Sequence, residues 1–358
     1  MIQSKANIEL KNFSADDIRF MQRALELAVL GRGTVSPNPM VGCVITHDGK
    51  IIGEGWHRKY GEAHAEVNAV NSVTDRSLLQ ESTCYVTLEP CAHHGKTPPC
   101  ADLLIRLKVK RVVIAAVDAN PLVGGQGIER MKAAGIQVET GCLEKEALAQ
   151  NIRFFTLMEK ERPYIILKWA QTSDGFVART NFDSKWISNE FSRSLVHQWR
   201  AEEDAILVGS NTAEYDNPTL NVRSWSGRNP LRILIDRKLR LADNLNLFDG
   251  SIPTLIYNTI SNEQQHNLEK VKVDKGRFIY SLVEDLGRRK VQSLIVEGGS
   301  AVLRAFIEAG LWDEARIFTS DVSFGEGIEA PKIHGQLLSK SDVMGDELSV
   351  YNASSNTF

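Results

Sequence analysis

Apolar residues along the chain recur at two spacings, and the change from one to the other predicts helices and strands in turn. In the N-terminal region, the spacing of a helix packed on one face is found at 15–30, 64–73, 101–109 and 127–135. Short apolar runs predict strands at 41–46, 51–56, 84–90, 111–118 and 136–141. Because Asp48-Gly49 is typical of a hairpin turn, residues 1 to about 145 are expected to form an α/β sheet that begins with a hairpin.

A second alternation follows a long helical segment at 144–163, which ends near Pro163 and is the expected link. Beyond it, strands are predicted at 164–170, 204–210, 232–236, 254–258, 277–281, 293–299 and 315–321. Helices are predicted between them at 192–202, 284–290 and 301–310. We therefore expect a first domain at residues 1–147, a linker helix at 148–162 and a second α/β domain at 163–358.

The composition is that of an ordinary globular protein. Hydrophobic residues make up 42% and charged residues 24% of the 358 positions, and 42 basic against 45 acidic side chains leave a net charge of −3. With no basic excess to hold a nucleic-acid backbone, no nucleic-acid partner is expected. Neither a signal peptide nor an apolar run long enough to cross a membrane is recognisable. Five cysteines, an odd number, favour a cytoplasmic protein with reduced thiols.

A His-x-Glu pair and two cysteines have the residue types of a catalytic zinc site. His64 and Glu66 open a predicted helix, Cys91 follows a predicted strand, and Cys100 comes after eight further residues. One imidazole and two thiolates bind tetrahedral zinc and leave one position open for water. Glu66 lies near the metal without having to bind it, as a general acid–base does. The pattern is typical of zinc deaminases, and the alternative is a structural histidine with two core cysteines.

Four segments around these residues resemble one particular family. They are Pro37–Gly42, Gly53–His57, Thr87–Cys91 and the long loop Cys91–Cys100. They are similar to the deaminase half of the bifunctional deaminase/reductases of riboflavin biosynthesis, the RibD type. The resemblance implies a cytidine-deaminase-like α/β/α domain.

In that family the corresponding histidine and two cysteines bind zinc, so the resemblance implies His64, Cys91 and Cys100 as ligands and Glu66 as proton shuttle. It also implies that Asn38 and Lys96 contact a pyrimidine nucleotide. His93 and His94 are expected to pack in the loop or to touch substrate, because a fourth protein ligand would close the open metal position.

Polar residues of the second domain gather where predicted strands end. Glycines at Gly298-Gly299-Ser300 would let a phosphate approach a helix N-terminus, although a simple tight turn explains them equally well. Lys168 lies towards the end of the strand predicted at 164–170. Arg200 and Arg223 have the guanidinium forks that match a sugar phosphate. Singly, such features have ordinary explanations as turns and solvated caps.

Together these residues resemble the reductase half of the same family, whose fold is similar to dihydrofolate reductase. The resemblance covers nearly the whole chain, with the deaminase half first, and is weak only around Asp321–Gly325. The cofactor contacts it implies, with NADPH as cofactor, are Gln171, Trp186, Thr212, Asp216, Gly298, Gly299 and Ser300. The substrate contacts expected with them are Lys168, Ser184, Arg200, Leu220, Arg223 and Glu297.

Arg237 is a further candidate, for recognition of the NADPH 2′-phosphate. It follows a predicted strand, and ligands of open α/β sheets bind beyond the carboxyl ends of strands. The family usually has a small hydroxyl residue at this position. The alternative is a solvated loop that carries Arg237, Lys238 and Arg240.

The preferred interpretation is a bifunctional enzyme with one zinc ion and one NADPH per chain, acting on small pyrimidine nucleotides. It would remove the 2-amino group of 2,5-diamino-6-ribosylamino-4(3H)-pyrimidinone 5′-phosphate and then reduce the ribosyl group of the aminouracil product to ribityl. A deaminase of bases in RNA or DNA is disfavoured by the net charge and the long second domain. A binding protein with inactive sites is disfavoured by the complete ligand set. The resemblance suggests a homodimer formed through the second domain.

Overall fold

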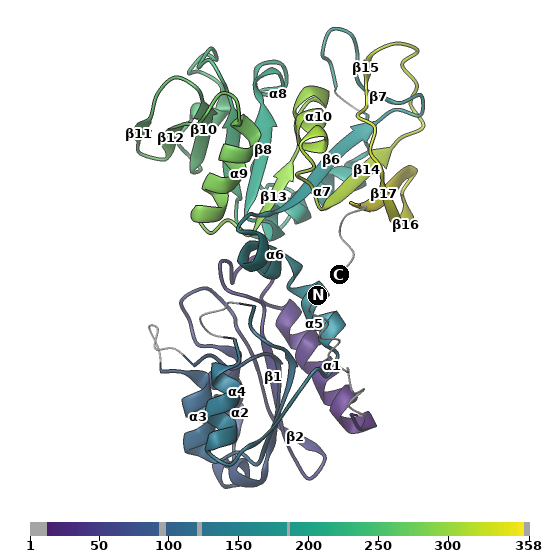
Figure 1. Cartoon of the computed structure of the whole chain (residues 1–358). Helices are drawn as coiled ribbons and strands as arrows, with labels where there is room; N and C mark the ends of the chain where they lie inside the picture. The colour runs from purple at the N-terminus through teal and green to yellow at the C-terminus, as the bar shows by residue number, and fades with distance from the viewer. Residues whose placement is uncertain (1–12, 93–97, 120–123, 185–186, 354–358) are drawn as a thin grey trace, which may run out of the picture. The chain divides into compact units, whose positions relative to one another are not determined.

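The computed structural model describes residues 13–92, 98–119, 124–184 and 187–353, and its chain divides into two units, Met1–Glu159 and Lys160–Phe358 (Figure 1). The sheet of the first unit has the order β2-β1-β3-β4-β5. Its β1 is antiparallel to both β2 and β3, whereas β3, β4 and β5 are parallel. The strands are β1 (Gly42–His47), β2 (Lys50–Trp56), β3 (Thr83–Leu88), β4 (Arg111–Ala116) and β5 (Gln137–Thr140).

Helices cover both faces of this sheet, as Figure 1 shows. One hydrophobic cluster joins the sheet to α2 (Ala65–Ser72), α3 (Cys100–Leu107) and α4 (Gln126–Ala133). The other joins it to α1 (Ala15–Val29), α5 (Glu144–Gln150) and α6 (Ile152–Lys160). A short 3-10 helix, η1 (Arg76–Glu81), leads into β3. The first unit is therefore an α/β/α sandwich.

The helix expected over 144–163 is divided into α5 and α6 at Asn151. Asn151 is 4% exposed, and its side chain accepts the N–H of Met40 and donates to the Met40 carbonyl, both at 2.8 Å. These two bonds satisfy the backbone of a buried loop residue. The break thus holds the Pro37–Met40 loop against the second layer of helices.

The second unit is built on a ten-stranded sheet of order β11-β12-β10-β9-β8-β13-β6-β14-β17-β16. It is parallel from β12 to β14 and has antiparallel pairs at its two ends. The parallel part consists of β6 (Tyr164–Gln171), β8 (Ala205–Gly209), β9 (Leu231–Ile235), β10 (Thr254–Asn258), β12 (Leu268–Lys272), β13 (Ser293–Val296) and β14 (Glu314–Thr319). The antiparallel ends are β11 (Glu263–Gln265), β16 (Gly335–Val343) and β17 (Asp346–Ala353), and β7 (Phe176–Ala178) pairs separately with β15 (Ile328–Glu329).

The helices of this unit pack on the two faces of its sheet. On one face, α9 (Phe278–Arg288) and α10 (Ser300–Glu308) complete the largest hydrophobic cluster. On the other, α7 (Glu190–Glu202) and α8 (Ser210–Asp216) cover β6, β8 and β9, and the 3-10 helix η2 (Asn246–Phe248) joins them. Lys168 lies within β6, which corresponds to the strand predicted at 164–170, and the polar residues after Gly209 form α8.

The strand expected at 277–281 is wrong, because this segment begins α9. Its buried residues Phe278, Leu282, Val283 and Leu286 have helical spacing, which becomes visible only when the segment is taken together with 284–290. The hairpin β16–β17 is missing from the predicted elements because β16 is exposed over nearly its whole length and lacks an alternating pattern.

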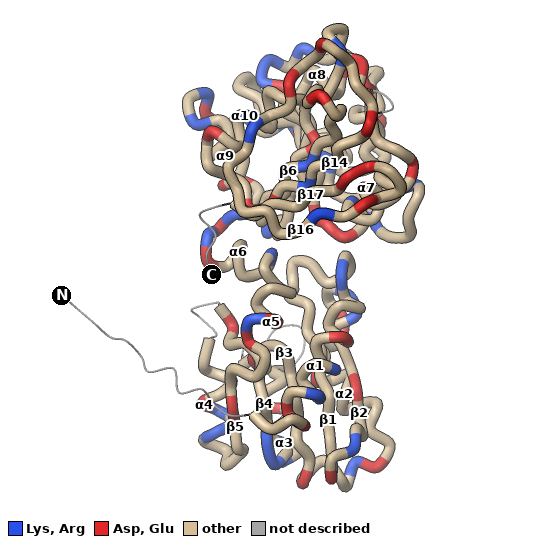
Figure 2. The backbone as a smooth tube through the Cα atoms, turned by 90° about the vertical axis from the view of Figure 1, so that its right-hand side faces the viewer, with Lys and Arg blue, Asp and Glu red and all other residues tan. Residues whose placement is uncertain are grey.

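Charged residues of both signs are interspersed along both units, as Figure 2 shows for the face in view. Among the described residues, no helix has the length and apolar character needed to span a membrane.

Candidate active sites

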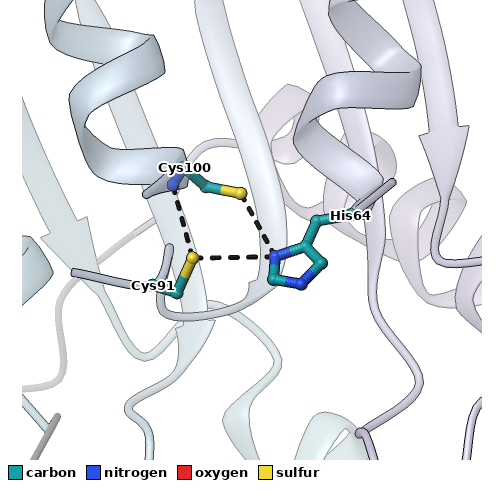
Figure 3. Close-up of side chains that lie close together, drawn as sticks. All are labelled: His64, Cys91 and Cys100. Carbon is teal, nitrogen blue, oxygen red and sulfur yellow. Dashed lines mark hydrogen bonds between the residues drawn. The ribbon is translucent and has the colours of Figure 1, made fainter. Parts of the chain in front are cut away.

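His64, Cys91 and Cys100 come together in the first unit from three different elements (Figure 3). His64 is the N-cap residue of α2, Cys91 follows β3, and Cys100 is the first residue of α3. Their ligand atoms all lie within 4.8 Å of one another. His64 Nδ1 is 3.6 Å from Cys91 Sγ and 3.3 Å from Cys100 Sγ.

The local sequence explains why α2 can bring His64 so close to the sheet. A Cβ atom on Gly55 of β2 would lie 2.2 Å from the Ala69 nitrogen and 2.6 Å from the Ala65 oxygen, so only glycine allows this helix to pack on β2. On the other side, the Cys100 backbone N–H donates to Cys91 Sγ at 3.3 Å. The two cysteines are thereby held side by side.

The three ligands fit a zinc ion on chemical grounds. Two thiol groups and one imidazole nitrogen form a soft donor set, and all three residues are at least partly buried. A hydrogen bond from the Cys100 thiol lowers the pKa of Cys91 despite its burial, which favours the thiolate form that binds a metal ion. The described residues supply three ligands, so a tetrahedral zinc held by them would keep a fourth coordination position for a reactant.

Glu66 lies in the first turn of α2 and is only 3% exposed. Burial raises the pKa of its carboxyl to about 7, and the negative charge of Cys91 adds to the effect. A cation bound by the neighbouring ligands would favour the carboxylate form. The Glu66 carboxyl also hydrogen-bonds the side chain of Cys100, so it is close enough to the ligands to exchange a proton with a group bound there.

Asn38 is oriented by a histidine that the sequence motifs contain but that was given no role. His57 Nδ1 lies 3.1 Å from the Ala63 carbonyl, to which it must donate. His57 Nε2 is then an acceptor, and it receives a hydrogen bond from Asn38 Nδ2 at 3.1 Å. Burial lowers the pKa of His57, which keeps the ring neutral. Within the part of the chain that the structure describes, the amide oxygen of Asn38 remains available to another partner.

Glu89 is a second residue to which the sequence analysis gave no role. Its carboxylate accepts the backbone N–H groups of Gly125 and Gly127, both at 2.9 Å, at the start of α4. It thereby fixes the segment that leads from β3 to Cys91. An acidic residue inside the Thr87–Cys91 motif was the available signal. Lys96, His93 and His94 lie outside the described residues.

A cavity of about 990 Å³ in the second unit brings together most of the residues expected there. Among the predicted cofactor contacts, Thr212, Asp216, Arg237, Gly298, Gly299 and Ser300 line it. All six predicted substrate contacts line it as well: Lys168, Ser184, Arg200, Leu220, Arg223 and Glu297. Gln171 is not among the lining residues; its side chain accepts a hydrogen bond from Trp169 Nε1 at 2.9 Å. Trp186 lies outside the described residues.

A buried ion pair forms one wall of this cavity. Arg200 donates to Glu297 at 2.8 Å, and both side chains are 11% exposed. Burial opposes the ionisation of Glu297, but Arg200 and Lys168 outweigh it and lower its pKa. Burial also lowers the pKa of Lys168. Within the described part of the chain, Arg200 Nε and Glu297 Oε1 are buried without a hydrogen-bond partner, so the wall has one donor and one acceptor to offer a ligand.

The glycine turn and a basic rim form another part of the cavity. The Gly299 N–H donates to Thr212 Oγ1 at 3.0 Å, so this N–H is already paired, while Gly298 and Gly299 lead directly into α10. Arg237, Lys238 and Arg240 follow β9 and line the cavity. Positive charge beyond a strand end and a glycine turn at a helix start both suit a phosphate-bearing dinucleotide.

Additional lining residues come from α7 and α8. Arg193, His197 and Arg200 are spaced by four and three residues on α7, which places them on one face of that helix. Tyr215 of α8 stacks on Phe182 with ring centroids 4.5 Å apart. The spacing on α7 was a readable signal, whereas nothing in the sequence links Phe182 to Tyr215.

Comparison with known proteins also finds two domains, one with each candidate site. The model for the cytidine and deoxycytidylate deaminase zinc-binding region matches residues 14–116, and the model for the RibD C-terminal domain matches residues 163–354. The riboflavin biosynthesis protein RibD of Aquifex aeolicus is 40% identical over 318 residues, 87% of this chain and 89% of its own.

Two solved structures are similar over nearly the full length. One is a diaminohydroxyphosphoribosylaminopyrimidine deaminase/5-amino-6-(5-phosphoribosylamino)uracil reductase from Thermotoga maritima, with a TM-score of 0.87 and 36% identity over 94% of this chain and 99% of that one. The other is RibD of Acinetobacter baumannii, with a TM-score of 0.86 and 33% identity over 94% and 98%.

A deaminase-type zinc-binding domain followed by an α/β reductase domain with its own cavity defines a two-domain enzyme with two active sites. The chain belongs to the RibD family, the bifunctional deaminase/reductases of riboflavin biosynthesis. The resemblance seen in the sequence is thus confirmed, together with the α/β class of both domains. Also confirmed are the cofactors, zinc for the deaminase and NADPH for the reductase.

Proposed function

We propose that the first domain deaminates 2,5-diamino-6-ribosylamino-4(3H)-pyrimidinone 5′-phosphate and that the second reduces the ribosyl group of the aminouracil product to ribityl. The observation that carries the first activity is the cluster of His64, Cys91 and Cys100 beside the buried Glu66. The second is supported by the cavity with its unpaired Arg200 and Glu297 atoms. The Thermotoga maritima protein is named for both activities, deaminase and reductase.

In the deaminase, His64, Cys91 and Cys100 would hold zinc, which supplies an activated water for attack on the amidine-like ring carbon. Glu66 would accept the proton of that water on its carboxylate and return it to the departing amino group, so that ammonia leaves. Asn38, with its amide nitrogen held by His57, presents its oxygen to a ring donor of the pyrimidine.

In the reductase, NADPH supplies the hydride, and the protein supplies orientation and electrostatics. Arg200 and Arg223 would bind the sugar phosphate through guanidinium forks. Lys168 and Glu297 would hydrogen-bond the ribosyl hydroxyls and hold protons close to the sugar oxygen. Gly298, Gly299, Ser300, Thr212 and Asp216 form the wall proposed to receive the cofactor.

Asp216 and Ser184 connect these two groups of contacts. Ser184 Oγ donates to the Asp216 carboxylate at 3.2 Å, so a residue proposed for substrate and a residue proposed for cofactor share one hydrogen bond. Gln171, Trp186 and Lys96 keep their proposed roles from the family resemblance alone.

Separate assays of the half-reactions test this proposal. The purified protein should release ammonia from the diaminopyrimidine nucleotide in a zinc-dependent manner. It should oxidise NADPH when the aminouracil nucleotide is supplied directly. Absence of either reaction in a folded, zinc-loaded protein would remove that half of the proposal.

We further propose a cytoplasmic homodimer. Zinc-binding thiolates need reduced cysteines, as in the cytoplasm, and all five cysteines are free. Strand β16 lies at the edge of the large sheet and exposes Leu337 (45%) and Leu338 (55%), which favours pairing with a second copy. Sedimentation of the full chain at micromolar concentration would test the dimer.

A further inference from the structure

His197 lies in the wall of the reductase cavity, and nothing above assigns it a function. It is on α7, three residues before Arg200, and is 3% exposed. A buried imidazole is expected to have hydrogen-bond partners, because burying a polar group without them costs free energy.

The contacts of His197 lead to the segment Leu220–Arg223, which lines the same cavity. His197 Nδ1 lies 3.5 Å from the backbone N–H of Arg223, which it accepts. One turn further along α7, Arg200 donates to the Asn221 carbonyl at 3.4 Å. Two side chains of one helix therefore hold the backbone of this segment.

The segment needs such support because its backbone is strained. Leu220, the first residue of the segment, has φ of 52°, in the left-handed region that non-glycine residues rarely adopt. Leu220 is also 2% exposed. Conformations of this kind persist only where the surroundings impose them.

A neutral His197 ring is required if Nδ1 is to accept the Arg223 N–H. Burial lowers its pKa to about 4, and the positive charges of Arg200 and Arg223 act in the same direction. Glu297 and a hydrogen bond with the Asn221 backbone oppose them. The ring is therefore neutral at physiological pH. Since Nδ1 accepts a hydrogen bond, the proton is on Nε2.

We propose that His197 is a positioning residue of the reductase: its Nδ1 anchors the Arg223 backbone, so that the exposed Arg223 side chain can reach the phosphate of the substrate. The inference rests on the proposed function, because it takes a sugar phosphate as the ligand of Arg223. It adds a determinant of phosphate affinity that does not itself contact the substrate.

A pair of variants tests the role of the acceptor. His197→Phe keeps a planar ring and removes the acceptor, whereas His197→Asn keeps an acceptor near the position of Nδ1. Loss of one buried hydrogen bond predicts an increase in KM for the aminouracil nucleotide of about tenfold in His197→Phe, with a smaller change in kcat. His197→Asn should stay within about threefold of the wild type.

Comparing ligands with and without the phosphate distinguishes a positioning role of His197 from a general disruption of the cavity. The dissociation constants of the nucleotide and of its dephosphorylated nucleoside should be measured for each variant. His197→Phe should weaken binding of the nucleotide and leave that of the nucleoside nearly unchanged. The NADPH dissociation constant reports that the reductase domain is folded.

Equal weakening of nucleotide and nucleoside, or identical behaviour of the Phe and Asn variants, would overturn the inference. So would a further loss when His197→Phe is added to Arg223→Ala, because the proposed effect acts through Arg223. If the wild-type protein does not reduce the aminouracil nucleotide at all, the proposed function fails, and this inference fails with it.

Discussion

Glu66 is the residue at which burial and a neighbouring metal act on protonation in opposite directions. Its burial raises its pKa to about 7, and a cation at the adjacent ligands would favour the carboxylate. A group with this balance can accept a proton and release it again in one reaction cycle. The position two residues after His64, on the first turn of α2, makes this arrangement possible.

We predict that Glu66→Gln keeps zinc and loses deamination by about a hundredfold or more, because the amide preserves shape but cannot accept the proton. Metal content by elemental analysis and ammonia release from the diaminopyrimidine nucleotide measure the two parts. The NADPH-dependent reaction of the same preparation is the internal control. Near-normal ammonia release would exclude Glu66 as the proton shuttle.

Two contacts hold the Arg237 side chain at the cavity rim, where it could distinguish NADPH from NADH. Its guanidinium donates to the Lys275 carbonyl at 3.1 Å and lies 4.6 Å from the centroid of the Phe278 ring. These contacts leave most of its donors available and reduce the entropy lost when a phosphate binds. The neighbouring Arg240 is already paired with Glu214 at 2.6 Å.

We therefore expect Arg237→Ala to raise KM for NADPH about tenfold and to leave KM for NADH nearly unchanged, since only NADPH has the 2′-phosphate. Initial rates with each cofactor give both values. Arg240→Ala is the matched control and should have a smaller effect. Equal changes for the two cofactors would mean that the 2′-phosphate is recognised elsewhere.

At the scale of elements, the residue at the break between α5 and α6 holds a loop that is distant in the sequence. The side chain of Asn151 satisfies both backbone groups of Met40, two residues from Asn38. The loop that presents Asn38 is thus attached to the helical layer and not only to the sheet.

For Asn151→Leu, we expect the free energy of unfolding of the first domain to fall by about 2 kcal/mol, because two buried backbone groups lose their partners. Ammonia release should fall as the Asn38 loop loosens, while the reductase rate is unchanged. Asn151→Asp keeps the acceptor for the Met40 N–H and should lose less. Thermal unfolding and the two assays provide the measurements, and unchanged stability of the Leu variant would contradict the role.

At the scale of the whole molecule, the two active sites draw on separate parts of the chain. The three metal ligands lie within Met1–Glu159, and every residue lining the large cavity lies within Lys160–Phe358. Each unit also has hydrophobic clusters of its own. The two chemistries should therefore be separable.

Removing zinc with a chelator is predicted to stop ammonia release and to leave reduction of supplied aminouracil nucleotide within about twofold of its starting rate. Adding zinc back should restore deamination. Parallel loss of both activities, with the circular dichroism spectrum unchanged, would contradict two independent sites.

Several features of this protein were determined by its sequence alone. The alternation of helical and strand spacings predicted two α/β domains, and His64, Glu66, Cys91 and Cys100 were predicted from their types and spacing. These signals are local. The spacing of apolar residues follows from the backbone geometry of helices and strands, and the ability to bind a metal follows from the type of side chain. The same locality explains the error at 277–281, where a short apolar run was compatible with either structure.

Tertiary structure decided which distant residues meet. Three hydrogen bonds join residues that lie 6 to 111 positions apart in the chain. They fix the tautomer of His57, pair Asn151 with Met40 and connect His197 to the Arg223 backbone. No local pattern records such contacts, because they depend on how helices pack on a sheet. Burial likewise shifts the pKa values of Glu66, Lys168 and His197, and burial is a property of the folded chain, not of any residue type.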